Sequence, residues 1–441
     1  MDKMQSIAMR MRRVRMTRHF GRVAAIQGGL IRAEGLGSHA SLGDRVVFPA
    51  PSGKPLEGEI VALHAGQSSI LPEGPMEGLS IGRRVELLFA ARLAPANGWI
   101  GRIIDPFGRP LDGRALVAGG EERGFRPAPP PAASRKRLGG RLDTGLALFD
   151  TLLPLVRGQR MGLFAGSGVG KSTLLSALAR GVSADVVVIA LIGERGRELR
   201  EFVEETLGED GMARSVVVAA TSDQSPLMRR RCAWAAMTVA EHFRDQGRHV
   251  LFLADSITRF AEAHREIALA AGESPSYRGF PPSTSHLIMS LAERSGPGPE
   301  GAGDITAIFS VLVAGSDMEE PVADILRGVL DGHVVLDRAI AERGRFPAVD
   351  VLRSVSRALP QAASAAENAL IARARASLGI HAESELMIRA GLYAPGSDPR
   401  LDEAVRLYPA LDAFCSRQGA DARQSFALLA EALGVPPPQS G

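Results

Sequence analysis

The stretch Ala165-Gly-Ser-Gly-Val-Gly170-Lys171-Ser172 decides the fold of this chain. It follows an apolar run at 161–164 and opens onto a segment rich in leucine and alanine that ends at Arg180. A strand, a glycine-rich loop and a helix in this order form the context of a phosphate-binding P-loop. The alternative, a chance glycine-rich turn, does not explain the Lys-Ser ending. The pattern therefore indicates a nucleotide site, but it does not identify the chemistry performed there.

Elementary chemistry gives the residues of this loop their roles. Glycines let backbone N–H groups turn inward around a β-phosphate, and the helix adds the positive end of its dipole. Lys171 is expected to reach the β- and γ-oxygens, and the Ser172 hydroxyl is expected to bind Mg²⁺. Ala165 replaces the first glycine of the usual pattern, which is compatible only with a negative φ at that residue. The predicted nucleotide-binding residues are Gly166, Ser167, Gly168, Val169, Gly170, Lys171, Ser172 and Thr173.

Length and composition predict a globular protein with a large core. The chain has 441 residues, of which 45% are hydrophobic and 23% charged, which is enough for two or three domains. Its apolar runs are too short for a transmembrane helix, and its N-terminus lacks the apolar stretch of a signal peptide. Cys232 and Cys415 have no metal-ligand spacing, which favours a reduced, cytoplasmic setting. A formal net charge of +3 does not by itself imply nucleic acid.

Residues 1–19 form a basic segment with one acid, Asp2. Apolar residues recur in it at helical spacing, so we expect an amphipathic helix that docks on a partner or lies on an anionic membrane surface. A solvated, frayed tail is an equal alternative. The basic residues are Lys3, Arg10, Arg12, Arg13, Arg15 and Arg18.

Three further regions follow along the chain. Residues 20–92 contain short β-rich segments separated by Gly, Pro and Ser clusters, which suggests a small barrel or sandwich. In residues 93–361 a proline-rich connector precedes alternating helices and apolar strands, typical of an α/β, doubly wound domain with its ligand at the carboxyl ends of parallel strands. Residues 362–441 show no strand pattern and contain segments rich in Ala, Leu and Glu, which predicts a helical domain. The predicted strands are 21–26, 45–48, 58–63, 84–89, 101–104, 161–165, 185–192, 215–219, 249–254 and 305–313, and the predicted helices include 228–244, 363–378 and 421–433.

Two carboxylates follow strands of the predicted sheet. Asp255 ends the apolar run 250–254 and is expected to orient Mg²⁺, directly or through water, with capping of the next helix as the alternative. Glu194 follows another strand, so it should lie at the same edge and position the attacking water. Glu198 is the rival, but it lies one helical turn further on and is expected to face solvent. A surface salt bridge is the alternative role for both glutamates.

Two longer motifs carry a family resemblance. Gly193-Glu194-Arg-Gly-Arg-Glu198 looks like the catalytic-glutamate motif of the rotary ATPase family, and Pro347-Ala-Val-Asp-Val-Leu-Arg-Ser-Val-Ser356 is similar to that family's signature. Within the family, the phrases at 158–172 and 331–338 resemble the type III export ATPases, with the flagellar members nearest. The resemblance extends over most of the chain.

The resemblance implies a fold and a set of site residues. It implies an N-terminal β-barrel, a RecA-like P-loop core and a C-terminal helical domain, with six copies in a ring and ATP with Mg²⁺ bound between subunits. It adds Arg195 as a catalytic residue, Arg357 as an arginine finger for the neighbouring subunit's nucleotide, and Phe346 as the ring that stacks on adenine. The alternatives are a helix-surface arginine and a core phenylalanine. Because Glu194 and Arg357 occur in one chain, every copy can supply both, which favours a homo-hexamer over an alternating hetero-ring.

The resemblance also implies partners and a location. These are a stator-like regulator, FliH, at the N-terminus, a stalk protein, FliJ, and the export gate, chaperones and export substrates. The expected location is the cytoplasm, peripheral at the inner face of the cell membrane. The implied activity is ATP hydrolysis coupled to flagellar type III protein export.

Three other functions compete with this interpretation. An injectisome ATPase of virulence secretion shares the chemistry and differs in its client. A hexameric RNA motor suits the core, but residues 20–92 lack the interleaved aromatic and basic side chains that stack single strands, so no nucleic acid is expected. A structural nucleotide-binding subunit without turnover would not need Glu194.

Overall fold

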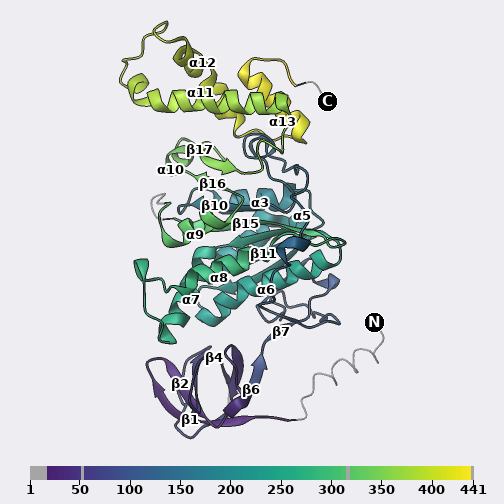
Figure 1. Cartoon of the computed structure of the whole chain (residues 1–441), viewed down its shortest axis with the longest axis vertical. Helices are drawn as coiled ribbons and strands as arrows, with labels where there is room; N and C mark the ends of the chain where they lie inside the picture. Colours follow the sequence, from purple (N-terminus) through teal and green to yellow (C-terminus); the bar gives the residue numbers. More distant parts are fainter. Residues whose placement is uncertain (1–16, 51–53, 314–317, 439–441) are drawn as a thin grey trace.

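The computed structural model describes residues 17–50, 54–313 and 318–438. A barrel, a broad sheet covered by helices and a layer of helices follow one another along the long axis of the molecule (Figure 1). The predicted basic helix at 1–19 lies outside the described residues except for 17–19. Among the helices of the described ranges, none combines the length and the apolar composition needed to cross a bilayer.

The N-terminal region is a closed antiparallel barrel, so the prediction of a barrel or sandwich is resolved in favour of the barrel. In β3 every second residue points inward, which places Val46 and Phe48 in the barrel core. The sequence prediction misses β2 and β5. Gly28 and Gly29, both with positive φ, form the tight turn between β1 and β2, and this pair is a hairpin signal. In spatial order the strands are β1 (Phe20–Gln27), β2 (Leu30–Glu34), β5 (Gln67–Pro72), β4 (Leu56–His64), β3 (Asp44–Phe48) and β6 (Arg84–Ala90).

The central sheet confirms the predicted α/β core. Its neighbouring strands run parallel, except that β17 is antiparallel to β16 at one edge and the short β14 is antiparallel to β15. The sequence prediction misses β16 and β17. In spatial order the strands are β17 (Val349–Ser356), β16 (Gly332–Leu336), β10 (Arg160–Ala165), β15 (Asp304–Leu312), β13 (His249–Asp255), β11 (Val186–Glu194), β12 (Ser215–Thr221) and β8 (Arg102–Ile104), with β14 (Gly296–Pro297) beside β15.

Strand β11 shows why these strands are continuous apolar runs. Val187 and Ile189 pack into one hydrophobic core with the P-loop helix and the C-terminal helices, whereas Val188 and Ala190 pack into a second core on the opposite face. A strand buried on both faces has no position for a solvated polar residue until it ends. Function therefore concentrates at the strand ends.

Helices cover both faces of this sheet, and the predicted helical C-terminal region is present (Figure 1). Its first helix begins with a capping box, in which Ser364 and Glu367 each bind the other's backbone N–H. The predicted domain boundaries after residues 92 and 361 stay predictions. The helices are α2 (Ala147–Asp150), α3 (Lys171–Gly181), α4 (Gly196–Glu201), α5 (Gly208–Met212), α6 (Pro226–Asp245), α7 (Ile257–Ala270), α8 (Ser283–Ala292), α9 (Pro321–Val329), α10 (Arg338–Glu342), α11 (Ala365–Arg389), α12 (Pro399–Phe414) and α13 (Ala422–Leu433).

Buried ion pairs join the barrel to the core. Glu59 on β4 accepts hydrogen bonds from Arg230 at 2.8 Å and from Arg231 at 2.6 Å, both on α6. Arg231 also pairs with Glu73 at 2.8 Å. Removing one member of such a group would leave a buried charge without compensation, so the pairs hold the barrel in one position on α6.

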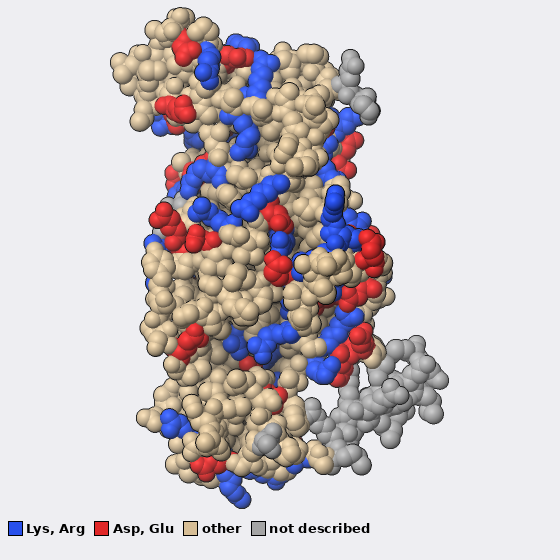
Figure 2. All heavy atoms as spheres, in the orientation of Figure 1, with Lys and Arg blue, Asp and Glu red and all other residues tan. Residues whose placement is uncertain are grey.

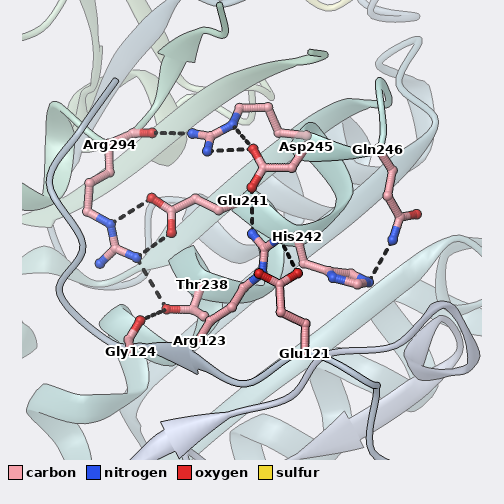
Figure 3. A network of polar contacts seen from close by, with 10 residues as sticks. Glu121, Arg123, Gly124, Thr238, Glu241, His242, Asp245, Gln246 and Arg294 are labelled. Atoms are coloured by element: carbon pink, nitrogen blue, oxygen red, sulfur yellow. Dashed lines mark hydrogen bonds and ion pairs between the residues drawn. The ribbon is translucent and has the colours of Figure 1, made fainter. Parts of the chain in front are cut away.

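Residues 121–125, which include the short strand β9 (Arg123–Gly124), form a strap that is tied to the C-terminal half of α6 (Figure 3). Arg294 donates to both carboxylate oxygens of Glu241, at 2.9 and 2.7 Å, and to the carbonyl oxygen of Phe125 at 2.6 Å. On the strap itself, Arg123 pairs with Asp245 at 2.5 Å. The side chains of Arg294 and Glu241 are only 3% and 5% exposed, so this bidentate pair is desolvated and fixes the strap in place.

We predict that Arg294→Ala lowers the free energy of unfolding by about 3–5 kcal/mol, because Glu241 is then left charged and buried without its partner. Arg200→Ala removes an ion pair with Glu204, whose members have side chains 77% and 58% exposed. This substitution should lower the free energy of unfolding by less than about 1 kcal/mol. Urea unfolding followed by tryptophan fluorescence measures both. Equal shifts of the two midpoints would show that the Arg294 pair does not stabilise the fold.

Candidate active site

A cleft of about 920 Å³ lies at the carboxyl edge of the central sheet. Strands β10, β13 and β11 run parallel and end there, so the segments directly after these strands are brought to one place. The volume suits a ligand of nucleotide size. The lining residues are those of 166–173 together with Gly193, Glu194, Arg195, Glu198, Ser222, Thr258, Arg259, Glu262, Leu312, Val313, Glu320 and Arg338.

The predicted P-loop residues, 166–173, all line this cleft. Gly168 and Gly170 have φ of +75° and +86°, which favour glycine, and Gly170 precedes the first turn of α3. The first N–H groups of a helix have no carbonyl partner within it, so those of α3 are free to donate to an anion. Ala165 is buried at the end of β10 and does not have a positive φ, so alanine fits where the usual pattern has glycine.

Lys171 interacts with both predicted carboxylates. Its Nζ donates to Asp255 Oδ1 and lies 4.0 Å from Glu194 Oε1. Asp255 is the last residue of β13 and only 3% exposed, and the hydroxyl of Ser310 on β15 donates to the same Oδ1 at 2.7 Å. The sheet thus gathers a lysine, an aspartate and a glutamate from three separate segments into one charged cluster.

A bulge directs Glu194 into the cleft. The register between β11 and β12 shifts between Ile192 and Glu194, and Gly193 between them has φ of +70°. Glycine therefore allows the strand to end in a turn that presents the glutamate to the ligand.

The environment raises the pKa of Glu194 to about 7. The main cause is burial, which disfavours the charged carboxylate, and the nearby negative charge of Asp255 adds to it, whereas Lys171 acts in the opposite direction. A carboxylate that titrates near neutral pH is well suited to accept a proton from water.

The side chains of the cleft fit Mg²⁺ with a triphosphate. Ser172 lines the cleft, and Asp255 and Glu194 offer carboxylate oxygens, which are the ligand type of Mg²⁺. Within 17–50, 54–313 and 318–438, no group of three or more His, Cys, Asp or Glu side chains could hold a metal alone. Mg²⁺ is usually held by one or two protein groups, substrate phosphates and water, so the side chains of Ser172 and Asp255 are of the number and type that this ion uses.

Phe346 lies beside the P-loop. Its side chain is 50% exposed, and its ring is 3.2 Å from the place that a Cβ atom on Gly170 would occupy. The alternative of a core phenylalanine is therefore wrong. An exposed aromatic face next to the phosphate loop can stack on a base.

Arg357 is the predicted site residue that the structure separates from the others. It directly follows β17 and not a helix, so the alternative of a helix-surface arginine is wrong. Its N–H donates to the carbonyl of Asp331 at 3.0 Å, and Asp331 binds Arg160 at the first residue of β10. The P-loop starts at the opposite end of β10, about 16 Å away at about 3.3 Å per strand residue. The exposed Arg357 is thus at the amino edge of the sheet, on the far side from its own P-loop.

Two residues at the start of α4 flank Glu194. The side chain of Arg195 is 79% exposed and pairs with Glu198 at 3.0 Å. Glu198 lines the cleft with its side chain 44% exposed, so it faces the site as well as the solvent, and the expectation that it faces solvent holds only in part. The reason is that α4 starts in the wall of the cleft. Thr258 and Arg259 also line the cleft, and the sequence reasoning misses them although they lie in the helical turn directly after Asp255.

Comparisons with known sequences place the chain in a family. A sequence model for the "ATP synthase alpha/beta family, nucleotide-binding domain" matches residues 145–356, and one for the "T3SS EscN ATPase C-terminal domain" matches residues 363–434. The chain is 46% identical to the flagellum-specific ATP synthase of Caulobacter vibrioides, over 98% of this chain and 99% of that protein. Identity to the flagellum-specific ATP synthase of Bacillus subtilis is 42%, over 93% and 91% of the two chains.

Solved structures show the same architecture. The assembled ATPase EscN from the enteropathogenic E. coli type III secretion system matches with a TM-score of 0.85 and 35% identity, covering 94% of this chain and 100% of EscN. EscN in complex with its central stalk EscO matches with a TM-score of 0.84. The chain belongs to the ATP synthase alpha/beta family, in its type III export ATPase branch, and is an ATPase. The predicted likeness to the flagellar members of this branch is confirmed.

We predict that Glu194→Gln stabilises the protein increasingly as the pH rises from 5 to 8. The folded-state pKa of about 7 lies above the ordinary value of 4.5, so Glu194 contributes stability below pH 4.5 that is lost as the pH rises through about 7. Glutamine is neutral at every pH, so the variant does not lose this stability, which is on the order of 2–3 kcal/mol of unfolding free energy at pH 8. Melting temperatures measured across this pH range test the prediction.

Glu204→Gln is the matched control, because Glu204 lies in the same segment with its side chain 58% exposed. It should follow the wild-type pH dependence. If the melting temperatures of Glu194→Gln and wild type differed by the same amount at every pH, the pKa of Glu194 would not be raised.

Proposed function

We propose that this chain hydrolyses ATP with Mg²⁺ at sites between the subunits of a homo-hexameric ring, and that the hydrolysis is coupled to flagellar type III protein export. One observation carries the proposal. The cluster of Lys171, Asp255 and Glu194 lies at the carboxyl edge of the sheet, whereas Arg357 lies at the amino edge of the same sheet. Each chain therefore presents two complementary halves of a hydrolytic site on opposite sides.

The P-loop half binds the nucleotide. Backbone N–H groups of residues 166–173 donate to the phosphates, and Lys171 exchanges its carboxylate partners for the β- and γ-oxygens. Ser172 and Asp255 would hold Mg²⁺, and the ion would supply positive charge beside the phosphates. Phe346 stacks on the adenine.

Glu194 is the general base. Its carboxylate accepts a proton from the attacking water and orients that water towards the γ-phosphate. The raised pKa of Glu194 makes this transfer feasible near neutral pH. Arg195, exposed at the mouth of the cleft, adds positive charge on the side of the departing phosphate.

Arg357 completes the neighbouring subunit's site. An arginine that reaches the γ-phosphate in the transition state is worth about 10³–10⁵ in rate. Its exposed position is unsuited to its own P-loop and suited to a P-loop docked against that edge. Because one chain carries both Glu194 and Arg357, a closed ring of identical copies has equivalent sites throughout.

The relatives support a flagellar client. Flagellum-specific ATP synthases share 42–46% identity with this chain, whereas the injectisome protein EscN shares 35%. The EscN–EscO complex supports a central stalk partner of the FliJ kind. A FliH-like stator at the N-terminus, the export gate, chaperones and export substrates belong to the same proposal, as does a cytoplasmic position at the inner face of the membrane.

An RNA motor is disfavoured by the barrel. Phe48 is buried in the barrel core, Phe20 is covered by Arg84 at 3.4 Å, and Phe89 packs edge-on against His19. Stacking of single strands needs exposed aromatic faces in a basic groove. On the face in Figure 2, basic and acidic side chains are interspersed along the molecule. Hydrolysis stimulated by single-stranded RNA would support the motor instead.

We predict that Arg357→Ala binds ATP with an affinity near that of wild type but has a kcat about 10³–10⁵-fold lower. Lys171→Ala should lose nucleotide binding. Mixed rings of the two variants should regain part of the wild-type rate, because one chain supplies the arginine and the other the P-loop. Phosphate release and sedimentation with a non-hydrolysable ATP analogue measure rate and assembly together.

Arg353→Ala is the control on the same strand, since Arg353 is 41% exposed and pairs with Asp337 at 3.7 Å. It should keep most of the activity. Absence of any rescue in rings that sedimentation shows to be mixed would refute catalysis between subunits.

The export role has a test in cells. In a flagellated bacterium that lacks its own copy of this gene, the wild-type chain should restore secretion of flagellin into the medium, and Glu194→Gln should not. Export restored fully by Glu194→Gln at wild-type protein levels would separate the ATPase activity from export.

A further inference from the structure

Ser310 occupies a special position in the sheet. It lies on β15, between the P-loop strand β10 and the strand β13 that ends at Asp255, and it pairs in register with Leu163. Its side chain is fully buried, at 0% exposure. Its hydroxyl donates to Asp255 Oδ1 at 2.7 Å. The buried hydroxyl of Ser310 thus holds one oxygen of Asp255, the carboxylate to which the proposed function assigns the metal.

The two oxygens of Asp255 have different surroundings. Oδ1 accepts hydrogen bonds from both Lys171 and Ser310. Oδ2 accepts none from the described residues. One oxygen is therefore occupied by donors of the protein, and the other keeps its lone pairs for a ligand.

The two donors differ in what a nucleotide does to them. Lys171 belongs to the P-loop, and its ammonium is drawn to the phosphates when a nucleotide binds. Ser310 is fixed on a central strand and buried on all sides, so its hydroxyl stays in place. After Lys171 leaves, Ser310 is the one donor of the described residues that still holds Oδ1.

We propose that Ser310 is a positioning residue for the metal-binding carboxylate: its hydroxyl fixes the rotation of Asp255, so that Oδ2 faces Mg²⁺ or its bound water once Lys171 has turned to the phosphates. This inference rests on the proposed Mg²⁺-dependent nucleotide site. Hydrogen bonds that orient a metal-binding side chain change metal affinity by about 10–100-fold when they are removed. A hydrogen bond to a charged acceptor is also among the stronger ones that a hydroxyl makes.

The test separates metal binding from nucleotide binding. A fluorescent ADP analogue is titrated into the full chain, first in excess EDTA and then across a series of Mg²⁺ concentrations. For Ser310→Ala we expect an unchanged affinity in EDTA and a Mg²⁺ midpoint raised about 10-fold or more. Ser310→Thr keeps the hydroxyl and should restore a midpoint near that of wild type.

Ser215→Ala is the matched control. Ser215 is another fully buried serine on a strand of the same sheet, and its hydroxyl donates to the carbonyl of Gly211 at 2.6 Å, outside the cleft. For Ser215→Ala, both the affinity in EDTA and the Mg²⁺ midpoint should equal those of wild type. A wild-type Mg²⁺ midpoint in Ser310→Ala, or an equal loss of affinity with and without Mg²⁺, would overturn the positioning role. If the wild-type chain shows no gain from Mg²⁺ at all, the proposed function fails first and the inference with it.

Discussion

One ammonium group held between two carboxylates is the interaction on which the rest of the site depends. Lys171 contacts Asp255 and lies 4.0 Å from Glu194, in a place from which most water is excluded. Two negative charges share one positive charge there, and this imbalance, together with burial, keeps the pKa of Glu194 high. In the proposed function, a bound nucleotide draws Lys171 to its phosphates, and Mg²⁺ would then supply the positive charge beside Asp255. The cluster therefore holds the groups that this proposed exchange needs.

The parallel sheet separates Arg357 from this charged cluster. Strands that all end at one edge bring the P-loop, Asp255 and Glu194 together. The antiparallel β17 reverses the chain and delivers Arg357 to the other edge. A rigid sheet, tied through Glu59 and Arg294 to the barrel and the strap, keeps these two halves apart within a chain. In the proposed ring, a neighbouring copy brings them together.

Much of this could be predicted from the sequence because the signals were local. The P-loop, the apolar strands and the carboxylates at their ends follow short-range rules, and the structure brings Lys171, Asp255 and Glu194 into contact as expected. The position of Glu198 in the wall of the cleft depends on where α4 begins after β11, which periodicity does not reveal. Ser310 was beyond prediction for another reason: its partner is far away in the chain, and only the strand order makes β15 the neighbour of β13. The strands β2, β5, β16 and β17 were missed because polar residues interrupt or flank their apolar residues, as Asp350, Arg353 and Ser354 do in β17.

Cross-linking between two single-cysteine chains tests the central claim most directly. One chain carries Arg357→Cys and the other Ser167→Cys, each with Cys232 and Cys415 replaced by serine. The two are mixed with a non-hydrolysable ATP analogue and a reagent that carries two maleimides joined through a disulfide, because a direct disulfide is too short to span an arginine side chain and a phosphate. The account predicts a cross-linked pair that forms with the analogue and disappears on reduction. Assembled rings, verified by sedimentation, that yield no such pair would show that Arg357 does not lie at its neighbour's phosphate loop.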